Sequence, residues 1–337
     1  MRAALYYGPG DIRFEDVPEP TIGAGDVIVR PLYNGLCGTD LHQYYVKAMA
    51  PVPLPIVIGH EFAGEIVEVG PGVSRVAVGD LVAVDPQWRC GTCSACSAGH
   101  YHLCFQYQCH GLGASGGGLS ELTAVTEAMT FPVPDGVEPA QAALAEPMSV
   151  SYHGVSLARP EPGTTAVVLG AGPIGIGCYL ALCALGVEDV VVTEPSPDRR
   201  AAIARLGAET VLDPTAGDVV GEILEHTRGL GATVAIDAAG TAESFRVGTA
   251  VTGRKGRFVT LAAYVEPVAY NPTDLMMREV AILASFSNCG DFAAVLDHMS
   301  RGRYPTDGWV EHVPFETHLD AYDRLHERSA MKVLVDL

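Results

Sequence analysis

A stretch of 22 residues without a charged side chain, Ala166 to Val187, limits the possible folds of this chain more than any other feature. A run of this length is long enough to span a bilayer. Five glycines and Pro173 interrupt it, however, and uncharged, glycine-rich strand-plus-helix segments are typical of nucleotide-binding cores. We therefore predict a buried strand followed by a helix here, and no membrane span.

The first part of this stretch contains Gly170, Gly172 and Gly175, spaced as Gly-x-Gly-x-x-Gly. The motif directly follows an apolar strand predicted at Ala166–Leu169 and opens an apolar helix predicted to extend through Leu185. In this context the first glycine permits a tight turn, the second lets the backbone approach a pyrophosphate, and the third lets helix and strand pack closely. The sequence therefore predicts a dinucleotide site at the N-terminus of the helix.

The next predicted strand ends at Glu194, 19 residues after Gly175, where a carboxylate would accept hydrogen bonds from the adenosine ribose diol. A carboxylate there would also repel the 2′-phosphate of NADP, so we predict NAD as the cofactor. Two alternatives remain: Glu194 is an ordinary exposed carboxylate, or Arg199 and Arg200 serve an NADP site. We interpret Arg199 and Arg200 as part of the adenine side of the site or as solvated helix charges.

The pattern along the chain predicts two domains and a closing segment. Up to about residue 145, alternating strands such as Asp26–Leu32, Gly64–Val69 and Asp80–Val84 are separated by turns, which predicts a β-rich domain. From about 150 to 285, apolar strands alternate with helical patterns, which predicts a parallel sheet with helices on both faces. The further predicted elements are strands at Thr165–Leu169, Asp189–Thr193, Val234–Asp237, Gly256–Leu261 and Lys332–Val335 and a helix at Phe292–Met299.

Four cysteines, Cys90, Cys93, Cys96 and Cys104, are spaced as C-x2-C-x2-C-x7-C in a loop rich in small residues. Four thiolates at this spacing can close a tetrahedral shell around one zinc ion, which predicts a structural site. An iron–sulfur cluster or a redox pair are the alternatives. We interpret the nearby His100, His102 and Cys109 as bystanders.

A second set of potential ligands is dispersed along the chain: Cys37, His60, Glu61 and Glu146. A thiolate, an imidazole and a carboxylate leave zinc an open coordination position, which is the mark of a catalytic ion. Taken one at a time, each residue is unremarkable, because a lone buried cysteine is usually a small hydrophobe and a lone histidine is usually an ordinary core or surface group.

The whole chain resembles the zinc-dependent medium-chain dehydrogenases, and within them the butanediol, sorbitol and threonine dehydrogenases. The matching segments are Cys37-Gly38-Thr39-Asp40-Leu41-His42, Gly59-His60-Glu61-Phe62-Ala63-Gly64 with Gly70, the four-cysteine lobe, Glu146-Pro147 and Gly170-Ala171-Gly172-Pro173-Ile174-Gly175. The resemblance implies an α/β protein with a GroES-like catalytic domain over residues 1–148, a Rossmann domain over 149–289 and a segment 290–337 that returns to the catalytic domain.

The resemblance also implies residue roles. Cys37, His60 and either Glu61 or Glu146 would bind the catalytic zinc, and we expect Glu146 to be the more easily observed ligand. Thr39 would hydrogen-bond the alcohol oxygen, His42 would pass the proton to solvent, and Asp40 would support the ligands. Without the resemblance, Thr39 and Asp40 could simply cap a turn, and His42 could be a surface residue. On the cofactor side the implied residues are Gly170, Gly172, Pro173, Ile174, Gly175, Glu194, Arg199, Ala238 and Leu261.

These features predict an NAD-linked enzyme with one catalytic and one structural zinc that moves a hydride between a secondary alcohol, vicinal diol or polyol and the nicotinamide, in a cleft between its domains. The Tyr44 to Pro55 loop and residues near Phe286 to Cys289 are expected to shape the substrate pocket. The rival interpretations are a zinc-free, NADPH-dependent quinone or enone reductase and a catalytically silent nucleotide-binding protein.

The net charge and the first residues of the chain disfavour several partners and locations. A net charge of −19, spread along the chain, disfavours binding to nucleic acid and to anionic membranes. Met1 to Gly10 does not resemble a secretory signal, so the default expectation is a cytoplasmic protein. A homodimer or homotetramer is expected from the resemblance.

Overall fold

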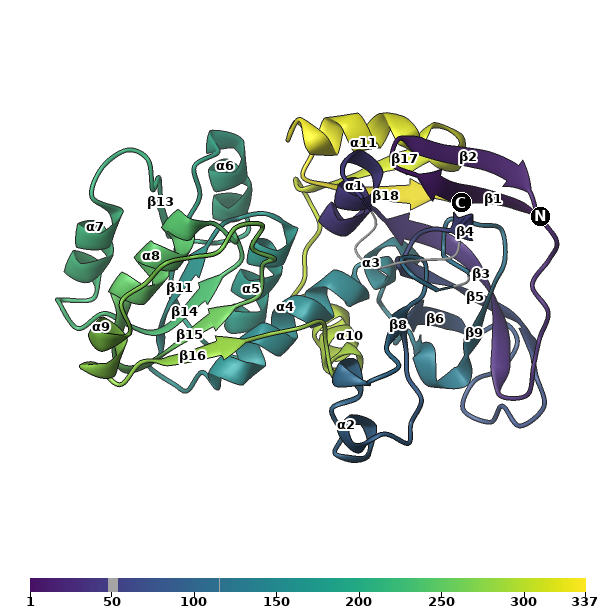
Figure 1. Cartoon of the computed structure of the whole chain (residues 1–337), viewed down its shortest axis with the longest axis horizontal. Coiled ribbons are helices and arrows are strands. Elements are labelled where there is room, and N and C mark those ends of the chain that lie inside the picture. The colour runs from purple at the N-terminus through teal and green to yellow at the C-terminus, as the bar shows by residue number, and fades with distance from the viewer. Residues whose placement is uncertain (48–53, 115) are drawn as a thin grey trace. The chain divides into compact units, whose positions relative to one another are not determined.

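The computed structural model describes residues 1–47, 54–114 and 116–337 (Figure 1), and the chain divides into two compact units. Unit 1 comprises Met1–Glu146, Phe292–Arg301 and Trp309–Leu337, and unit 2 comprises Pro147–Asp291 and Gly302–Gly308. The C-terminal segment predicted to return to the first domain belongs to unit 1 from Phe292 onward, except for the seven residues Gly302–Gly308, which belong to unit 2.

Unit 1 is built on antiparallel sheet with helices at its margins. A three-stranded sheet has the order β2-β1-β4, and a seven-stranded sheet has the order β10-β6-β5-β3-β18-β17, with β9 also paired to β3. Its strands are β1 Arg2–Gly8, β2 Asp11–Asp16, β3 Asp26–Gly35, β4 Ile56–Val57, β5 Glu61–Val69, β6 Leu81–Val84, β7 Gln87–Trp88, β8 Gln108–Cys109, β9 Thr123–Thr126, β10 Thr130–Pro132, β17 Val310–Pro314 and β18 Lys332–Asp336. Its helices are α1 Gly38–Tyr45, α2 Ser94–Ser97, η1 Tyr101–Leu103, η2 Glu127–Met129, α3 Pro139–Ala143, α10 Phe292–Ser300, η3 Phe315–Thr317 and α11 Leu319–His326.

The alternation of side chains along β3 explains why this strand is central to unit 1. Val27 and Val29 point into a core that they share with Phe62 and Ile66 of β5, and all four side chains are essentially inaccessible. The register of the sheet then sets Gly35 of β3 opposite Glu61 of β5 on one side and Leu334 of β18 on the other. The sheet thereby brings the end of β3 and the start of β5 together with β18, beside the start of α1.

Unit 2 is a parallel, doubly wound domain. Its six strands have the order β13-β12-β11-β14-β15-β16 and all pair in parallel. This is the 3-2-1-4-5-6 order of a Rossmann fold, in which ligands bind at the carboxyl ends of the strands near the point where the order reverses. The strands are β11 Thr165–Leu169, β12 Asp189–Thr193, β13 Thr210–Leu212, β14 Ala232–Asp237, β15 Thr252–Thr260 and β16 Ala281–Ala284. The helices are α5 Pro173–Ala184, α6 Pro197–Arg205, α7 Val219–His226, α8 Ala242–Val251 and α9 Pro272–Met276, and α4 Ala145–Ala158 carries the division between the units.

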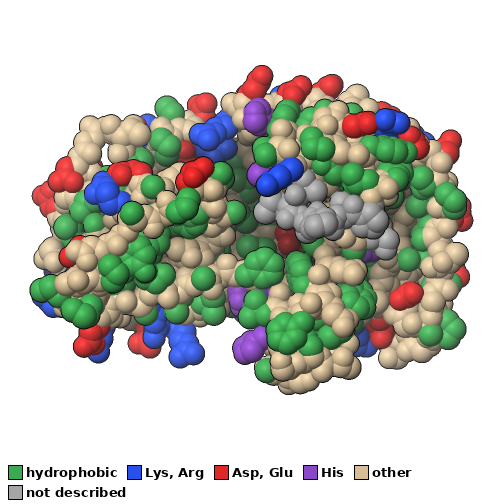
Figure 2. All heavy atoms as spheres, viewed as in Figure 1, with side chains coloured by type: hydrophobic (Ala, Val, Ile, Leu, Met, Phe, Trp, Pro, Cys, Tyr) green, Lys and Arg blue, Asp and Glu red, His purple; other side chains and the backbone are tan. Residues whose placement is uncertain are grey.

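The uncharged stretch Ala166 to Val187 is divided between a strand and a helix, as predicted. β11 supplies the strand, and α5 is a helix of 12 residues with eight of them buried, because its surface is apolar on every side. Within the described residues, none of the helices has the length and apolar character needed to cross a membrane. Figure 2 shows acidic and basic side chains interspersed on the face in view, so the net charge is not gathered there into one patch.

Most predicted elements are confirmed with small shifts at their ends. The strands at Thr165–Leu169 and Asp189–Thr193 match the structure, and β3 and β15 are longer than predicted. The sequence analysis did not predict β13 or β16. β13 has only three residues and β16 has four, so neither offers enough residues for a periodic pattern.

Candidate active site and metal centres

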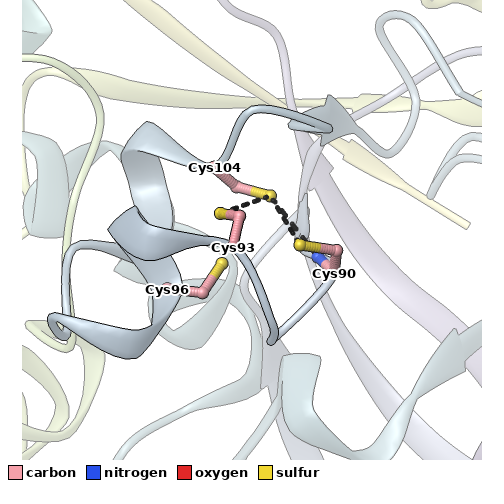
Figure 3. Close-up of side chains that lie close together, drawn as sticks. All are labelled: Cys90, Cys93, Cys96 and Cys104. Carbon is pink, nitrogen blue, oxygen red and sulfur yellow. Dashed lines mark hydrogen bonds between the residues drawn. The ribbon is translucent and has the colours of Figure 1, made fainter.

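The four-cysteine lobe brings its sulfur atoms together. The Sγ atoms of Cys90, Cys93, Cys96 and Cys104 all lie within 4.8 Å of one another and point toward a common centre (Figure 3). Four soft donors at this separation match the closed tetrahedral shell of a structural zinc ion. His100, His102 and Cys109 are not members of this group among the described residues.

Backbone N–H groups favour the thiolate form of two cysteines in the lobe. Backbone N–H groups of Thr92 and Cys93 lower the pKa of the Cys90 thiol to about 6, and N–H groups of Cys96 and Phe105 also lower the pKa of Cys93. Burial raises the pKa of Cys96 to about 12. A bound cation would favour the thiolate form of all four cysteines.

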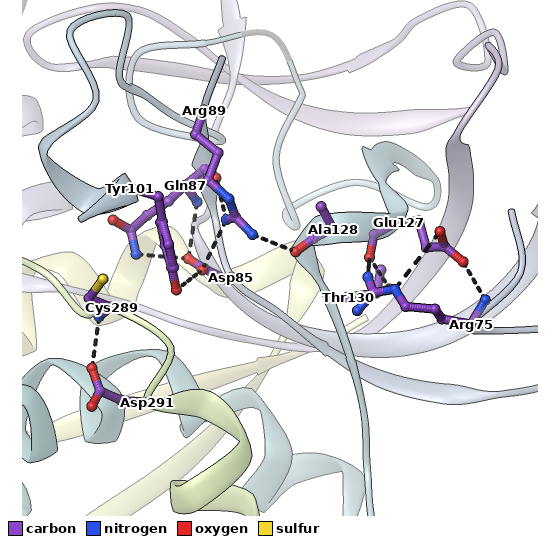
Figure 4. Close-up of polar contacts among 10 residues, drawn as sticks. All are labelled: Arg75, Asp85, Gln87, Arg89, Tyr101, Glu127, Ala128, Thr130, Cys289 and Asp291. Atoms are coloured by element: carbon purple, nitrogen blue, oxygen red, sulfur yellow. Dashed lines mark hydrogen bonds and ion pairs between the residues drawn. The ribbon is translucent and has the colours of Figure 1, made fainter. Parts of the chain in front are cut away.

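A buried carboxylate anchors the lobe to the sheet. Asp85 follows β6 and is fully inaccessible, and Figure 4 shows the side chains of Gln87, Arg89 and Tyr101 converging on it. Its oxygens accept from the side-chain amide of Gln87 at 3.0 Å and from the hydroxyl of Tyr101 at 3.3 Å, and Arg89 lies 3.6 Å away. Because Tyr101 belongs to the lobe, this network fixes the position of the lobe relative to β6. Burial raises the pKa of Asp85 to about 6.

A second group of metal-binding atoms comes from two segments of unit 1 that are distant in the sequence. The ligand atoms of Cys37, His60 and Glu61 lie within 4.8 Å of one another. Cys37 precedes α1, His60 precedes β5, and Glu61 begins β5, so the group forms where the sheet meets the first helix. A thiolate, an imidazole and a carboxylate are a donor set that zinc accepts with a coordination position left open.

Asp40 holds two of these three residues in place. One of its oxygens accepts a hydrogen bond from the backbone N–H of Cys37 at 2.8 Å, and the other lies 3.4 Å from Nδ1 of His60. A carboxylate on Nδ1 leaves Nε2 of the imidazole to face a metal ion, which is the usual arrangement around zinc-binding histidines. Asp40 is buried, and it also completes the N-terminal cap of α1.

Lys332 is a charged residue of this site that the sequence analysis missed. Its ammonium group donates to the Glu61 carboxylate and, at 2.9 Å, to the carbonyl oxygen of Leu36. Lys332 and Glu61 are 2% and 1% exposed. Burial works against the ammonium, but Glu61, Cys37 and Glu146 together outweigh it and hold the pKa of Lys332 above its ordinary value. The only hint in the sequence is a lysine at the start of an otherwise apolar strand.

Gly35 makes room for this ion pair. A Cβ atom at position 35 would lie 2.1 Å from Oε2 of Glu61 and 3.2 Å from Cε of Lys332. Any larger residue would therefore separate the carboxylate from the ammonium. The close packing shows that this end of β3 is shaped around the charges.

Glu146, the fourth predicted ligand, lies outside the group of three. It is near the N-terminus of α4 and is buried, and it is not a member of the group whose ligand atoms all lie within 4.8 Å of one another. Burial raises the pKa of Glu146 to about 8, while His60 and Lys332 favour its charged form. Glu146 thus belongs to the same electrostatic environment, and Glu61 is the carboxylate that stands beside Cys37 and His60.

The two residues predicted to handle the substrate proton both lie on α1. Oγ1 of Thr39 is 3.6 Å from Sγ of Cys37. His42 follows three residues later, so it lies on the same face of the helix as Thr39. Both are half-buried. Of the predicted pocket loop Tyr44 to Pro55, residues 48–53 lie outside the described residues.

The glycine motif adopts the geometry that a dinucleotide requires. Gly170 has a φ of +98°, Gly172 caps α5, and Pro173 and Ile174 form the first turn of that helix. A Cβ atom at Gly175 would lie 2.0 Å from the carbonyl oxygen of Gly170, so only glycine fits there. These features leave the N-terminus of α5 open to a pyrophosphate.

Glu194 follows β12 and faces the glycine-rich turn. Its carboxylate accepts hydrogen bonds from the N–H groups of Ala171 at 2.8 Å and of Ser196 at 2.9 Å, and the residue is 5% exposed. It is therefore not an ordinary exposed carboxylate. Arg200 donates to the backbone and pairs with Asp213 at 3.0 Å.

The remaining predicted cofactor residues border the same turn. The guanidinium of Arg199 lies 3.6 Å from where a Cβ of Gly172 would be. Ala238 donates its N–H to the carbonyl oxygen of Leu169, and Leu261 donates its N–H to that of Asp237. The residues at the carboxyl ends of β11, β12, β14 and β15 therefore come together at one edge of the sheet.

Two family models match the chain. The model for the alcohol dehydrogenase GroES-like domain matches residues 23–135, and the model for zinc-binding dehydrogenases matches residues 173–301. The (R,R)-butanediol dehydrogenase of Neisseria gonorrhoeae is 32% identical over 354 residues, which covers 100% of this chain and 99% of that relative. The sorbitol dehydrogenase of Bombyx mori is 32% identical over 341 residues, which covers 99% and 97%. The crystal structure of 2R,3R-butanediol dehydrogenase from Bacillus subtilis has a TM-score of 0.92 at 33% identity, covering 100% of this chain and 99% of that chain.

The chain therefore belongs to the zinc-dependent medium-chain dehydrogenases, as its motifs predicted. Within that superfamily it falls in the branch of the butanediol, sorbitol and threonine dehydrogenases, and it is an alcohol or polyol dehydrogenase. The predicted combination of a GroES-like domain and a Rossmann fold is confirmed.

Proposed function

We propose that this enzyme oxidises secondary alcohols that carry a neighbouring oxygen, such as vicinal diols and polyols, with NAD, and reduces the corresponding ketones in reverse. The observation that carries the proposal is the group formed by Cys37, His60 and Glu61 in a chain that also has a complete glycine motif. The similarity to butanediol and sorbitol dehydrogenases supports this substrate class.

We further propose two zinc ions per chain. Cys90, Cys93, Cys96 and Cys104 would hold a structural ion, and Cys37 and His60 would hold a catalytic ion together with a carboxylate. Bound there, zinc would act as a Lewis acid that lowers the pKa of a hydroxyl group and polarises a carbonyl group. NAD would supply the hydride acceptor.

The protein's own groups would orient the ligands and move the proton. Asp40 fixes the Cys37 backbone and the His60 ring, and the Lys332 ammonium balances one buried carboxylate charge. The Thr39 hydroxyl is placed to hydrogen-bond a substrate oxygen held beside Cys37 and to take its proton. His42, one turn further along α1, would carry that proton toward solvent.

The preference for NAD rests on Glu194. Its carboxylate lies at the carboxyl end of β12, where the adenosine ribose would bind, and a 2′-phosphate there would meet a buried negative charge. The ion pair between Arg200 and Asp213 supports the same conclusion, because it engages the arginine that would otherwise be available to a phosphate.

The first test combines metal analysis with kinetics. Protein prepared without chelator should contain two zinc ions per chain, and a diol should be turned over faster with NAD than with NADP. A substrate panel in which simple primary alcohols outperform every diol and polyol would refute the substrate proposal. Absence of zinc with NADPH-dependent turnover would favour the rival reductase, and absence of any turnover would favour a silent nucleotide-binding protein.

A pair of variants tests the carboxylates. Glu61→Ala and Glu146→Ala should each keep their affinity for NAD, because both residues lie in unit 1 and the glycine motif lies in unit 2. Each should lose at least roughly tenfold in turnover, the scale expected when a ligand or its support is removed. Near-normal turnover in both variants would show that neither carboxylate affects the reactivity of the metal ion.

We also propose that the chain forms a homo-oligomer. β16 is an edge strand of the parallel sheet, and its Ala281, Ile282 and Ala284 are exposed, as are Met276 and Met277 nearby. An apolar edge strand without charged residues readily pairs with another chain. Ile282→Lys should therefore shift the mass measured by light scattering toward that of the monomer, and an unchanged mass would contradict this proposal.

A further inference from the structure

A buried carboxylate whose acceptor sites are all used lies at the ligand-binding edge of unit 2. Asp237 is the last residue of β14 and has no exposed surface. One of its oxygens accepts from the N–H groups of Ala239 at 2.8 Å and of Gly240 at 3.1 Å, and the other accepts from the hydroxyls of Ser244 at 2.8 Å and of Tyr264 at 2.5 Å. A carboxylate offers about four acceptor sites, so this one is fully used.

The four donors come from three different segments. Ala239 and Gly240 belong to the loop after β14, Ser244 lies in the first turn of α8, and Tyr264 lies in the segment that connects β15 to α9. The backbone adds a further link, because the carbonyl oxygen of Asp237 accepts from the N–H of Leu261 at 3.0 Å. Asp237 therefore joins the loop 238–240 to the loop 261–263.

These two loops also pack against each other and against the glycine-rich turn. Gly240 has a φ of +69°, and a Cβ there would lie 2.8 Å from Cβ of Ala262 and 2.8 Å from the carbonyl oxygen of Ala263. A Cβ at Gly170 would lie 3.2 Å from Cβ of Ala239. A change in either loop would thus be transmitted to the surface where a dinucleotide would lie.

The hydrogen bond from Tyr264 to Asp237 can be removed without creating a cavity in the core. Its ring is half-buried and packs edge-on against Phe245, with centroids 6.1 Å apart. Burial and the hydrogen bond to Asp237 raise the pKa of Tyr264, so its hydroxyl remains a donor. Replacing tyrosine with phenylalanine would keep the ring contact and remove only the hydrogen bond.

The loops 238–240 and 261–263 follow β14 and β15, which belong to the half of the doubly wound sheet that does not contain β12 and Glu194. We infer that Asp237, Ser244 and Tyr264 form a buried latch that holds these loops in the conformation that binds the nicotinamide half of the dinucleotide. This inference rests on the proposed function, since it takes NAD as the ligand. Tyr264 is a positioning residue in this arrangement. The latch carboxylate has no remaining acceptor site with which to contact the cofactor itself.

The test compares two ligands that differ in the nicotinamide. Tyr264→Phe should raise the Kd of NADH roughly three- to tenfold, the effect of losing one hydrogen bond that preorganises a binding loop. The Kd of ADP-ribose, which lacks the nicotinamide, should stay within about twofold of the wild-type value. Hydrogen exchange should also become faster at the amides of loops 238–240 and 261–263.

Tyr270→Phe is the matched control. The ring of Tyr270 also contacts Phe245, with centroids 5.4 Å apart, but the residue is 51% exposed and lies beyond the latch. This variant should leave both dissociation constants unchanged.

Two results would overturn the inference: equal weakening of NADH and ADP-ribose binding in Tyr264→Phe, or no change in either. A wild-type protein that binds NADPH in preference to NADH would instead refute the NAD proposal. The latch would then be tested by comparing how Tyr264→Phe changes the Kd of NADPH and the Kd of ADP-ribose.

Discussion

Replacing Lys332 with methionine would test whether the buried ion pair is part of the architecture of the catalytic site. Methionine keeps much of the apolar stem of lysine and removes the ammonium group. The Glu61 carboxylate and the carbonyl oxygen of Leu36 would both lose their donor in a place that water does not reach.

The magnitude follows from the burial of both partners. Removing one member of a buried ion pair typically costs about 3–5 kcal/mol, because the other charge stays buried without compensation. We expect Lys332→Met to lower the free energy of unfolding by about 3 kcal/mol, toward the lower end of that range, since bound zinc would offset part of the uncompensated charge of Glu61. In the Glu61→Gln background, Lys332→Met should cost much less than it does in the wild type, because it then leaves no unpaired charge.

Urea unfolding of the zinc-loaded protein, followed by circular dichroism, measures these values. The control is Lys255→Met, which breaks an ion pair with Glu279 in which the side chains are 79% and 64% exposed. That pair is screened by solvent, so breaking it should change the free energy of unfolding little. The reasoning would be refuted if Lys332→Met cost no more than Lys255→Met, or if Lys332→Met cost as much in the Glu61→Gln background as in the wild type.

Three further predictions concern the cofactor, the lobe and pH. Glu194→Ser should reduce the preference for NAD over NADP by roughly tenfold, about 1.4 kcal/mol, in ratios of kcat/KM, and a wild-type enzyme that already uses NADP equally well would contradict the assignment. Cys93→Ser should lower the zinc content from two ions to one and reduce the thermal midpoint, whereas Cys183→Ser, outside the lobe, should leave the zinc content unchanged; retention of both ions in Cys93→Ser would exclude the structural site. Burial lowers the pKa of His110 to about 4, so between pH 6.5 and pH 4 the unfolded chain binds a proton there that the folded chain does not, and the free energy of unfolding falls as the pH drops through that window. Between pH 7 and pH 5, the free energy of unfolding of the wild type should therefore fall by about 2 kcal/mol more than that of His110→Asn, as measured by urea unfolding. An equal fall in both proteins would show that His110 does not titrate in this way.

Much of unit 2 could be predicted from the sequence because its signals are local. The glycine motif, the strand before it and Glu194 lie within about 30 residues, and each depends on its immediate neighbours in the chain. The four cysteines are similarly confined to one loop, so their spacing alone indicated a metal site. The short strands β13 and β16 escaped prediction because a few residues carry no period, and their positions depend on pairing with β12 and β15.

The catalytic group required more than spacing. Cys37, His60 and Glu61 were first identified as part of a dispersed donor set, and the resemblance to a known family then implied their roles, since each residue by itself has an ordinary structural explanation. Glu146 was expected to be the more easily observed ligand, but the sheet sets Glu61 beside Cys37 and His60 because Glu61 begins β5 opposite Gly35. The sequence gives no measure of which of two carboxylates a strand register will bring closer.

The sequence by itself determined the two domain types, the nucleotide-binding turn and the cysteine lobe, because local periodicity and short-range spacing encode them. Only the tertiary structure decided which side chains from distant segments share one environment. Lys332 and Glu61 are separated by 271 positions and meet because β18 and β5 both pair with β3, and Tyr264 reaches Asp237 because β14 and β15 end at the same edge of their sheet. Strand pairing between distant segments sets these contacts, and no pattern in the residues around either partner specifies it.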